Sequence, residues 1–330
     1  MPSWLIAIFC IADIDTCALQ LVCNGLRGNT QRTYTSAQRY YFQFCASLQL
    51  HPIPATEQHL LRFVSYAHLK GLSSSTIQVY LSGISSLHSI NGLPSPPVNS
   101  YRVKLALKAV SDIAPGVRRR LPITYHLLSY IIEQLQPGHH NLLWSAVLSL
   151  GFFGALRGSE YTAIYIPPNG WVAPKLKHVV FKQSQGHPAM IFTIPKSKTS
   201  SAPIQVPIGC SRTPICAVCT MHTYLRARTP ALGLHPESYL FVDAQGRPAT
   251  KYQLNSIIKN AINGLGLDSK NYSSHSLRSG AATTASQLGF TEPELKALGH
   301  WASQAYTAYV HQDFATNFNY ASRLASQTIQ

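Results

Sequence analysis

Apolar side chains return at every third or fourth position through the first third of the chain, the spacing of amphipathic helices. Polar residues fill the positions between them, and Gly71, Gly92 and a proline-rich segment after Leu93 separate the stretches. Glycine and proline at these places are typical helix ends. We expect helices over 31–48, 54–70, 73–91 and 101–113. Together they predict a compact bundle of four short helices.

The rest of the chain is predicted to be mainly helical with one small sheet. Val, Ile and Phe are enriched in three short runs, 178–182, 190–194 and 204–207, separated by Gly, Pro and Ser turns. The expected helices span 124–135, 141–156, 214–227, 250–264, 276–288, 291–298 and 315–325. No strand leads through a glycine-rich loop into a helix, so neither a P-loop nor a dinucleotide-binding fold is supported. The predicted fold class is mainly α with a small antiparallel β-sheet (α+β).

Composition divides the chain into a leader, two domains and a linker. Residues 114–122 combine a Pro-Gly turn signal with three arginines between prolines, which is typical of a linker. This linker separates a helical domain, 27–113, from a larger domain, 123–330. Residues 1–26 begin with an apolar run too short to span a bilayer and without the basic start of a signal peptide. We interpret them as a leader helix or a start-site artefact, and we expect no membrane association.

The distribution of charge along the chain predicts a binding partner. Lys and Arg number 27 against 12 Asp and Glu, a net charge of +15, and acids are absent from 58–111 and again from 161–236. Unopposed positive fields suit a polyanion, most simply double-stranded DNA. We expect DNA contacts from the fourth helix and from the basic linker, although a basic triplet is also typical of a solvated hinge. These residues are Arg102, Lys104, Lys108, Arg118, Arg119 and Arg120.

The shortage of acids also limits the chemistry. A two-metal nuclease needs several carboxylates that converge on its ions. The available acids, Asp112, Glu133, Glu160 and Glu237, lie in no local motif. We therefore expect no catalytic metal. We also expect no cofactor and no small-molecule substrate.

The seven cysteines are an odd number in a long chain, which favours a reducing compartment over a disulfide scaffold. Cys210, Cys216, Cys219 and His222 could form a zinc tetrad, but their spacing is unusual. We instead interpret 214–227 as a helix that buries Cys216 and Cys219 as small apolar residues.

One short motif points to an anion. His275 and Arg278 are three residues apart, so on a helix both side chains point the same way. The small residues 279–285 that follow let this helix pack closely, which would bury part of Arg278. A buried guanidinium needs an anionic partner. Downstream lie Gly299-His300-Trp301 and, nine residues after His300, Tyr309.

Upstream, GALRGSE at 154–160 places Arg157 directly after an apolar helix, and a polar turn at 196–201 carries Lys196 and Lys198. This order resembles the tyrosine recombinase (phage integrase) family, in which an Arg, a hairpin Lys, an HxxR pair, a second His or Trp and a C-terminal Tyr surround one phosphate. The resemblance covers about residues 30–325. HSLRSGAATTA and GHW are closest to recombinases of eukaryotic mobile elements of the DIRS or Ngaro kind.

The resemblance implies a four-helix core-binding domain followed by a catalytic domain, and a metal-independent DNA strand transferase with a 3′-phosphotyrosyl intermediate. The implied catalytic residues are Arg157, Lys198, His275, Arg278, His300 and the nucleophile Tyr309. Glu160 would orient an active-site Arg or His. Lys196 competes with Lys198 as the hairpin lysine, and Tyr306, one turn before Tyr309, competes as the nucleophile.

The family also implies a homotetramer on DNA, with the C-terminal segment 314–325 exchanged between subunits or packed on its own domain. A eukaryotic recombinase of this kind would be nuclear, and otherwise cytoplasmic or in the nucleoid. Two other functions stay open. One is a catalytically idle DNA-binding protein derived from a mobile element, and the other is a helical scaffold or RNA-binding protein whose motif matches are accidental.

Overall fold

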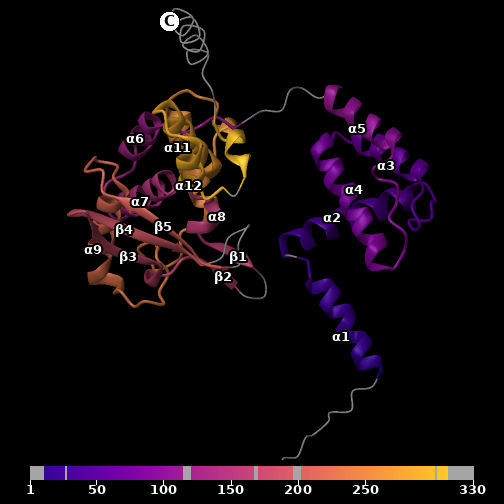
Figure 1. Ribbon diagram of the computed structural model, residues 1–330, viewed down its shortest axis with the longest axis horizontal. Helices are drawn as coiled ribbons and strands as arrows, with labels where there is room; N and C mark the ends of the chain where they lie inside the picture. Colours follow the sequence, from indigo (N-terminus) through magenta and orange to yellow (C-terminus); the bar gives the residue numbers. More distant parts are fainter. Residues whose placement is uncertain are drawn as a thin grey trace, which may run out of the picture. The chain divides into compact units, whose positions relative to one another are not determined.

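The computed structural model describes residues 11–26, 28–113, 120–166, 170–195, 202–301 and 303–310. The chain divides into two compact units, Met1–Val117 and Arg118–Gln330, and each has its own apolar core. Helices predominate, and the strands form small antiparallel sheets (Figure 1). The predicted fold class is therefore confirmed. In the described part of the chain, every helix is too short or too polar to cross a membrane.

The first unit is helical throughout its described residues. Its helices are α1 (Ile11–Asn24), α2 (Gly28–Ser47), α3 (Glu57–Leu69), α4 (Ser74–Ile90) and α5 (Tyr101–Ile113). The last four match the helices predicted from the apolar spacing. Helices α3 and α4 begin later than expected because the hydroxyls of Thr56 and Ser73 cap them, each accepting a hydrogen bond from a backbone N–H three residues on.

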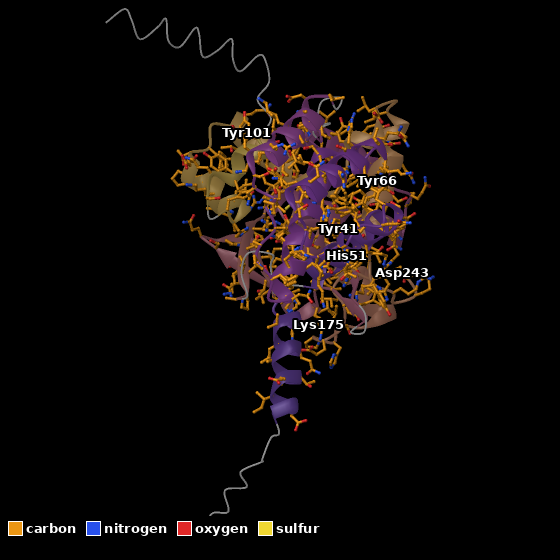
Figure 2. The ribbon with its side chains drawn as sticks, turned by 90° about the vertical axis from the view of Figure 1, so that its right-hand side faces the viewer. Tyr41, His51, Tyr66, Tyr101, Lys175 and Asp243 are labelled. Atoms are coloured by element: carbon orange, nitrogen blue, oxygen red, sulfur yellow. The ribbon has the colours of Figure 1, made fainter. Side chains whose placement is uncertain are left out.

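Aromatic rings hold this unit together. The rings of Tyr41 and Phe44 each lie with their centroids 5.4 Å from that of Phe63, and the Tyr41 hydroxyl donates to the carbonyl of Pro52 at 2.9 Å. Figure 2 labels Tyr41 and Tyr66 on this unit. Helices α2 and α4 approach closely at Gly83, where a Cβ atom would lie 2.8 Å from that of Ala37. Aromatic rings thus join α2 to α3, and a small residue lets α2 and α4 pack closely.

The second unit wraps around one buried helix. Helix α7 (His139–Phe153) is buried from Leu143 to Phe152, which explains its continuous apolar sequence. Around it lie the remaining helices and strands of the unit. These are α6 (Tyr125–Glu133), α8 (Gly158–Tyr161), α9 (Ala217–Leu232), α10 (Lys251–Gly264), α11 (Ser274–Gln287), α12 (Glu292–Gly299), β1 (Ile164–Ile166), β2 (Gly170–Val172), β3 (Val179–Ser184), β4 (His187–Ile194) and β5 (Ile204–Gly209), with 3₁₀ turns η1 (Leu176–His178), η2 (Ser269–Asn271) and η3 (Gln304–Ala308).

The main sheet has the order β3-β4-β5 and is antiparallel throughout. Met190, Phe192 and Ile194 alternate inward along β4, the pattern that predicted the strand. Helix α9 packs against β4 and β5, at the end of the unit away from α11 and α12 (Figure 1). The hairpin of β1 and β2 and the single turn α8 were not predicted, since three or four residues are too few to show a period.

Helix α11 lies deep in this unit because its residues are small. A Cβ atom on Gly280 would lie 1.7 Å from the carbonyl oxygen of Ile123. The segment that enters the unit runs along the start of α11, where Ile123 N donates to Ser276 O at 2.9 Å. This contact supports the prediction that the run after Arg278 allows close packing.

Candidate active site

Arg278, on the first turns of α11, is almost completely buried, with 1% of its surface exposed. Its two terminal nitrogens each donate at 2.5 Å, one to the carbonyl of Ala155 and the other to that of Gly299. Its Nε–H has no hydrogen-bond partner among the described residues, and none of their ion pairs includes it. A buried, unpaired guanidinium with a free donor is a site for an anion.

Burial, followed by the positive charge of Arg157, lowers the pKa of Arg278 to about 10, while Glu160 and Tyr309 oppose the shift. The group therefore remains charged at neutral pH. Two cations close together, such as Arg157 and the buried Arg278, repel each other and raise the free energy of the fold unless both face the same negative charge.

Trp301 covers the guanidinium of Arg278. The guanidinium carbon lies 4.4 Å from the centroid of the indole ring. This position depends on the sharp turn at the end of α12, where His300 has φ 54° in the left-handed region. It also depends on Gly299, because a Cβ atom there would lie 2.0 Å from the ring. The three residues Gly-His-Trp thus act as one unit that ends a helix and closes over Arg278.

Arg157 precedes α8 and is held by Glu160. The Glu160 carboxylate accepts from the backbone N–H of Arg157 at 2.7 Å and from its guanidinium at 2.9 Å. Glu160 is itself buried, which fits the predicted orienting role. The residue two before Arg157, Ala155, has φ 44°, and its carbonyl binds Arg278. The turn after α7 therefore positions both arginines, one through a carboxylate and the other through a carbonyl.

His275 lies one turn before Arg278, among cations. Burial first, then Lys251, Arg120, Arg278 and Arg157, lower the pKa of its imidazole. Burial and Arg278 also lower the pKa of His300, with Glu160 opposing. Both imidazoles are therefore neutral at neutral pH. A neutral imidazole can accept a proton or donate one hydrogen bond to an oxyanion.

Tyr309 directly follows the turn η3 and is held against α11. Its carbonyl accepts from the hydroxyls of Ser279 at 2.9 Å and Thr283 at 3.3 Å. Its ring centroid lies 5.4 Å from that of Trp301 and also 5.4 Å from the guanidinium carbon of Arg278. The tyrosine is thus brought beside the buried arginine, although they are 31 residues apart in the sequence.

Tyr306 faces a different neighbour. Its ring lies 6.3 Å from that of Trp301, and the cation contacts of Arg278 within the described residues involve Trp301 and Tyr309 only. Lys296 chiefly, with smaller contributions from Gln304 and Tyr306, lowers the pKa of Glu292. The position of the Tyr309 ring beside Arg278 favours Tyr309 as the residue that could attack an anion bound at Arg278.

Several predicted residues lie outside the described residues. These are Lys196 and Lys198 between β4 and β5, Arg118 and Arg119 in the linker, and the segment 314–325. Arg120 is described, and its guanidinium donates to the carbonyl of Tyr272 at 3.2 Å. It therefore lies at the start of α11, close enough to lower the pKa of His275.

Lys251, the first residue of α10, was not predicted. It acts on the imidazole of His275, and its stem passes Gly158, where a Cβ atom would lie 3.3 Å from the Lys251 Cε. Its sequence context, a lysine after a capping threonine, is ordinary and carries no signal of a site. The Gly-His-Trp motif drew attention to Trp301 in the sequence, but its contact with Arg278 is seen only in the folded structure.

The cationic surface is less open than the sequence suggested. Arg102 pairs with Glu57 at 3.1 Å, whereas Lys104 and Lys108 on the same helix are exposed. Lys175 and Lys177 lie in the acid-free stretch 161–236, yet both bind Glu237, at 2.7 and 2.6 Å. These hydrogen bonds lower the pKa of Glu237 to about 2.

Arg228 is likewise not available to a polyanion. It is buried and donates to the carbonyls of Tyr239 and Leu240. The acid-free stretch 161–236 therefore folds so that part of its charge is neutralised or internal, a result of tertiary contacts with the segment that follows it.

The expectation that α9 buries both of its cysteines is wrong for one of them. Cys216 is buried, but Cys219 is exposed and Cys210 is partly exposed. The helix begins at Ala217 rather than at 214, which turns Cys219 away from the core.

The sequence was compared with models of known protein families and with curated proteins. The sequence model of the Phage integrase family matches residues 185–316, which include His275, Arg278, His300 and Tyr309. None of the curated proteins matches the sequence.

Solved structures match over both units. The chain is similar to the Tn1549 transposon integrase in complex with transposon right end DNA, with a TM-score of 0.61, 16% identity and coverage of 94% of this chain and 99% of that one. It is also similar to XerH recombinase bound to palindromic difH substrate, with a TM-score of 0.63, 18% identity, and 93% and 84% covered. The match to a lambda integrase dimer bound to a COC′ core site has a TM-score of 0.57, 16% identity, and 90% and 94% covered. At these identities the likeness establishes the fold.

Proposed function

We propose that this chain, a member of the tyrosine recombinase (phage integrase) family, is a site-specific DNA recombinase that cuts and rejoins strands through a phosphotyrosine. The observation that carries the proposal is the buried guanidinium of Arg278, which has a free donor and a tyrosine ring 5.4 Å away. A phosphodiester of DNA supplies the missing anion. The similar Tn1549 integrase and XerH were both solved with DNA, which supports duplex DNA as the partner.

In the first step the Tyr309 hydroxyl oxygen attacks the phosphorus, and the bond from phosphorus to the 5′ oxygen breaks. The product is a 3′-phosphotyrosyl enzyme and a free 5′-hydroxyl end. His275 is neutral because burial and nearby cations lower its pKa, so it can accept the proton from Tyr309. Lys198 donates a proton to the leaving 5′ oxygen.

The negative charge on the nonbridging oxygens grows during this attack. Arg157 and Arg278 bring two guanidinium groups to it, and His300 brings a hydrogen-bond donor. Glu160 binds Arg157 at two atoms and acts by holding its fork in place. Because these side chains stabilise the charge, the reaction needs no catalytic divalent cation.

A second DNA 5′-hydroxyl reverses the step. It attacks the phosphotyrosine and gives its proton back to Lys198, the tyrosine oxygen leaves with a proton returned from His275, and a new phosphodiester forms. The bond energy is kept in the ester throughout, so no ATP is consumed.

A suicide substrate tests this function. Duplex DNA with a nick beside the cleavage site loses the short 5′-hydroxyl fragment, so the covalent complex accumulates and migrates slowly in denaturing electrophoresis. We expect the adduct with the wild-type chain in buffer without added divalent cation, none with Tyr309→Phe, and the adduct again with the matched control Tyr306→Phe. Because Tyr309→Phe removes one oxygen, DNA binding should persist.

Other results would contradict the proposal. DNA binding without any adduct would favour a catalytically idle DNA-binding protein. Selective RNA binding would favour an RNA-binding protein whose motif matches are accidental. If the Tyr309→Phe variant formed an adduct that mapped to another tyrosine, that tyrosine would be the nucleophile instead of Tyr309. For the lysine, Lys198→Ala should be rescued by a substrate with a 5′ sulfur leaving group, which needs no proton, while Arg278→Ala should not.

We propose further that the protein acts as a homotetramer on two duplexes, is encoded by a retrotransposon-like mobile element of the DIRS or Ngaro kind, and works in the nucleus. The motifs HSLRSGAATTA and GHW support the element type. Sedimentation of the protein with DNA tests the tetramer, and truncation after Asp313 tests whether 314–325 holds it together. A fluorescent fusion in eukaryotic cells that stays outside the nucleus would contradict the location.

A further inference from the structure

Three thiols meet at the edge of the main sheet. Cys210 follows the end of β5, Cys216 precedes α9, and Cys219 lies in the first turn of α9. The sulfur of Cys210 lies 3.4 Å from that of Cys219 and 3.6 Å from that of Cys216, and all three lie within 4.8 Å of one another. Among the described residues, this is the one group of His, Cys, Asp or Glu side chains close enough to hold a metal ion.

These distances suit a tetrahedral zinc ion. Zinc binds thiolates at about 2.3 Å, so two sulfurs of its tetrahedron are about 3.8 Å apart. A disulfide between any two of these cysteines would require a sulfur separation of about 2 Å and would leave the third thiol out. One cation at the centre uses all three.

The backbone is arranged to receive a thiolate at Cys216. The N–H of Ser211 donates to its sulfur at 3.3 Å. Its own carbonyl accepts the first hydrogen bond of α9, from Thr220, so its sulfur lies at the positive end of the helix dipole.

A divalent cation between the three sulfurs would bind them as thiolates, and the protons released by the thiols would pass to solvent.

We propose that Cys210, Cys216 and Cys219 bind a structural Zn²⁺ ion, with His222 as the fourth ligand. Cys210, Cys219 and His222 line the same cavity of about 630 Å³ beside β3 and β4. His222 lies outside the group of three sulfurs, so its side chain would turn toward the ion to bind it. His222 is one turn after Cys219 on α9, and its ring packs against Phe181 with centroids 5.8 Å apart. Among the residues that line this cavity, only the cysteines and His222 are usual zinc ligands.

The ion would tie the end of β5 to the start of α9. Helix α9 already packs against β4 and β5, and the metal would close the loop between strand and helix. Four protein ligands leave no open position for substrate, which makes the role structural. The site is separate from the proposed DNA chemistry, and it replaces our expectation that these cysteines are only apolar filling.

Metal content of the full chain tests the proposal. We expect about one zinc per chain by elemental analysis of protein purified under reducing conditions, as for a closed structural site. After removal of zinc, added Co²⁺ should give the absorption bands of a tetrahedral thiolate complex, and zinc should displace it. Cys210→Ser, Cys216→Ser and Cys219→Ser should each lose these signals, whereas the control Cys17→Ser, an exposed thiol on α1, should keep them.

Stability gives a second measurement that does not depend on DNA cleavage. A strong zinc chelator should lower the melting temperature of the wild type and of Cys17→Ser, but should not lower that of Cys216→Ser further. His222→Ala should bind zinc at least tenfold more weakly, and an unchanged affinity would remove His222 from the ligand set. Wild-type protein that neither contains zinc nor binds Co²⁺, or that shows a disulfide among the three cysteines in place of metal, would overturn the proposal.

Discussion

The side chains of Arg278 and Trp301 are stacked, with the guanidinium carbon 4.4 Å from the centroid of the indole ring. Arg278 lies on α11 and Trp301 lies just after the end of α12, so this contact joins two separate segments of the chain. A planar fork that is both stacked and bound to two carbonyls cannot be replaced by another cation without loss.

Arg278→Lys should therefore lower the rate of adduct formation by about a hundredfold or more, the size typical of losing one transition-state charge donor. The lysine retains the positive charge, so DNA affinity should change little. Single-turnover cleavage and a binding titration measure the two effects separately. The control Arg247→Lys alters an exposed arginine paired with Asp243 and should leave the rate unchanged. Equal rates for Arg278→Lys and wild type would exclude the proposed role.

Gly299→Ala should disturb the same stack from the other side. Its Cβ atom would overlap the Trp301 ring at 2.0 Å, so the indole must move away from Arg278. We expect a loss of about 1–3 kcal/mol in unfolding free energy, as for overpacking, together with slower cleavage. Gly264→Ala on α10 is the matched control because nothing lies within 4 Å of its Cβ position, and it should be neutral or slightly stabilising.

Glu160→Gln should separate positioning from binding. The amide can still accept from the Arg157 backbone N–H, but it loses the charged contact with the guanidinium. We expect a loss of about 1.5–3 kcal/mol in stability, the usual size for a hydrogen bond to a charged group. Cleavage should slow while the concentration of DNA needed for half-maximal rate stays constant. If that concentration rose with no change in maximal rate, Glu160 would act on binding instead.

Stability of the free protein should fall as pH is lowered from about 7 to 5. Burial and neighbouring cations lower the folded-state pKa of His275 and His300 below the unfolded value of about 6.5. The unfolded chain then binds more protons, so the contribution is complete above about pH 6.5 and is lost as pH falls toward the folded pKa. Chemical denaturation at several pH values measures it.

The double variant His275→Gln with His300→Gln should show a weaker dependence on pH. It should not remove the dependence entirely, because burial and two lysines also lower the pKa of His178. An identical pH dependence in the variant and the wild type would contradict the assignment.

DNA binding should depend steeply on salt. A clamp that neutralises six to ten phosphates would lose about 10³–10⁵ in affinity between 50 and 200 mM salt. Lys104→Ala should reduce the slope of log affinity against log salt by about one. Lys70→Ala is the control within the same unit, since Lys70 lies over the Tyr66 ring and is not among the predicted DNA contacts. A flat slope for the wild type would contradict electrostatic binding.

Much of this protein follows from local sequence. The helices of the first unit and the three main strands could be predicted because each depends on a short period, and short motifs were enough to propose the candidate site residues. The predicted burial of Arg278 followed from seven small residues after it, and the structure agrees, with 1% of its surface exposed. Elements of three or four residues, such as α8 and the hairpin of β1 and β2, escaped because they are shorter than the periods that reveal structure.

The relationships between distant residues were decided only by the tertiary structure. The pairing of Lys175 and Lys177 with Glu237, the approach of Lys251 to His275, and the meeting of Cys210 with Cys216 and Cys219 join separate elements. The sequence by itself determines the side chains and, because helices and strands have short periods, the positions of most of these elements. Which of them touch depends on how the elements pack, and close-packed interiors set that through contacts such as Gly280 on Ile123.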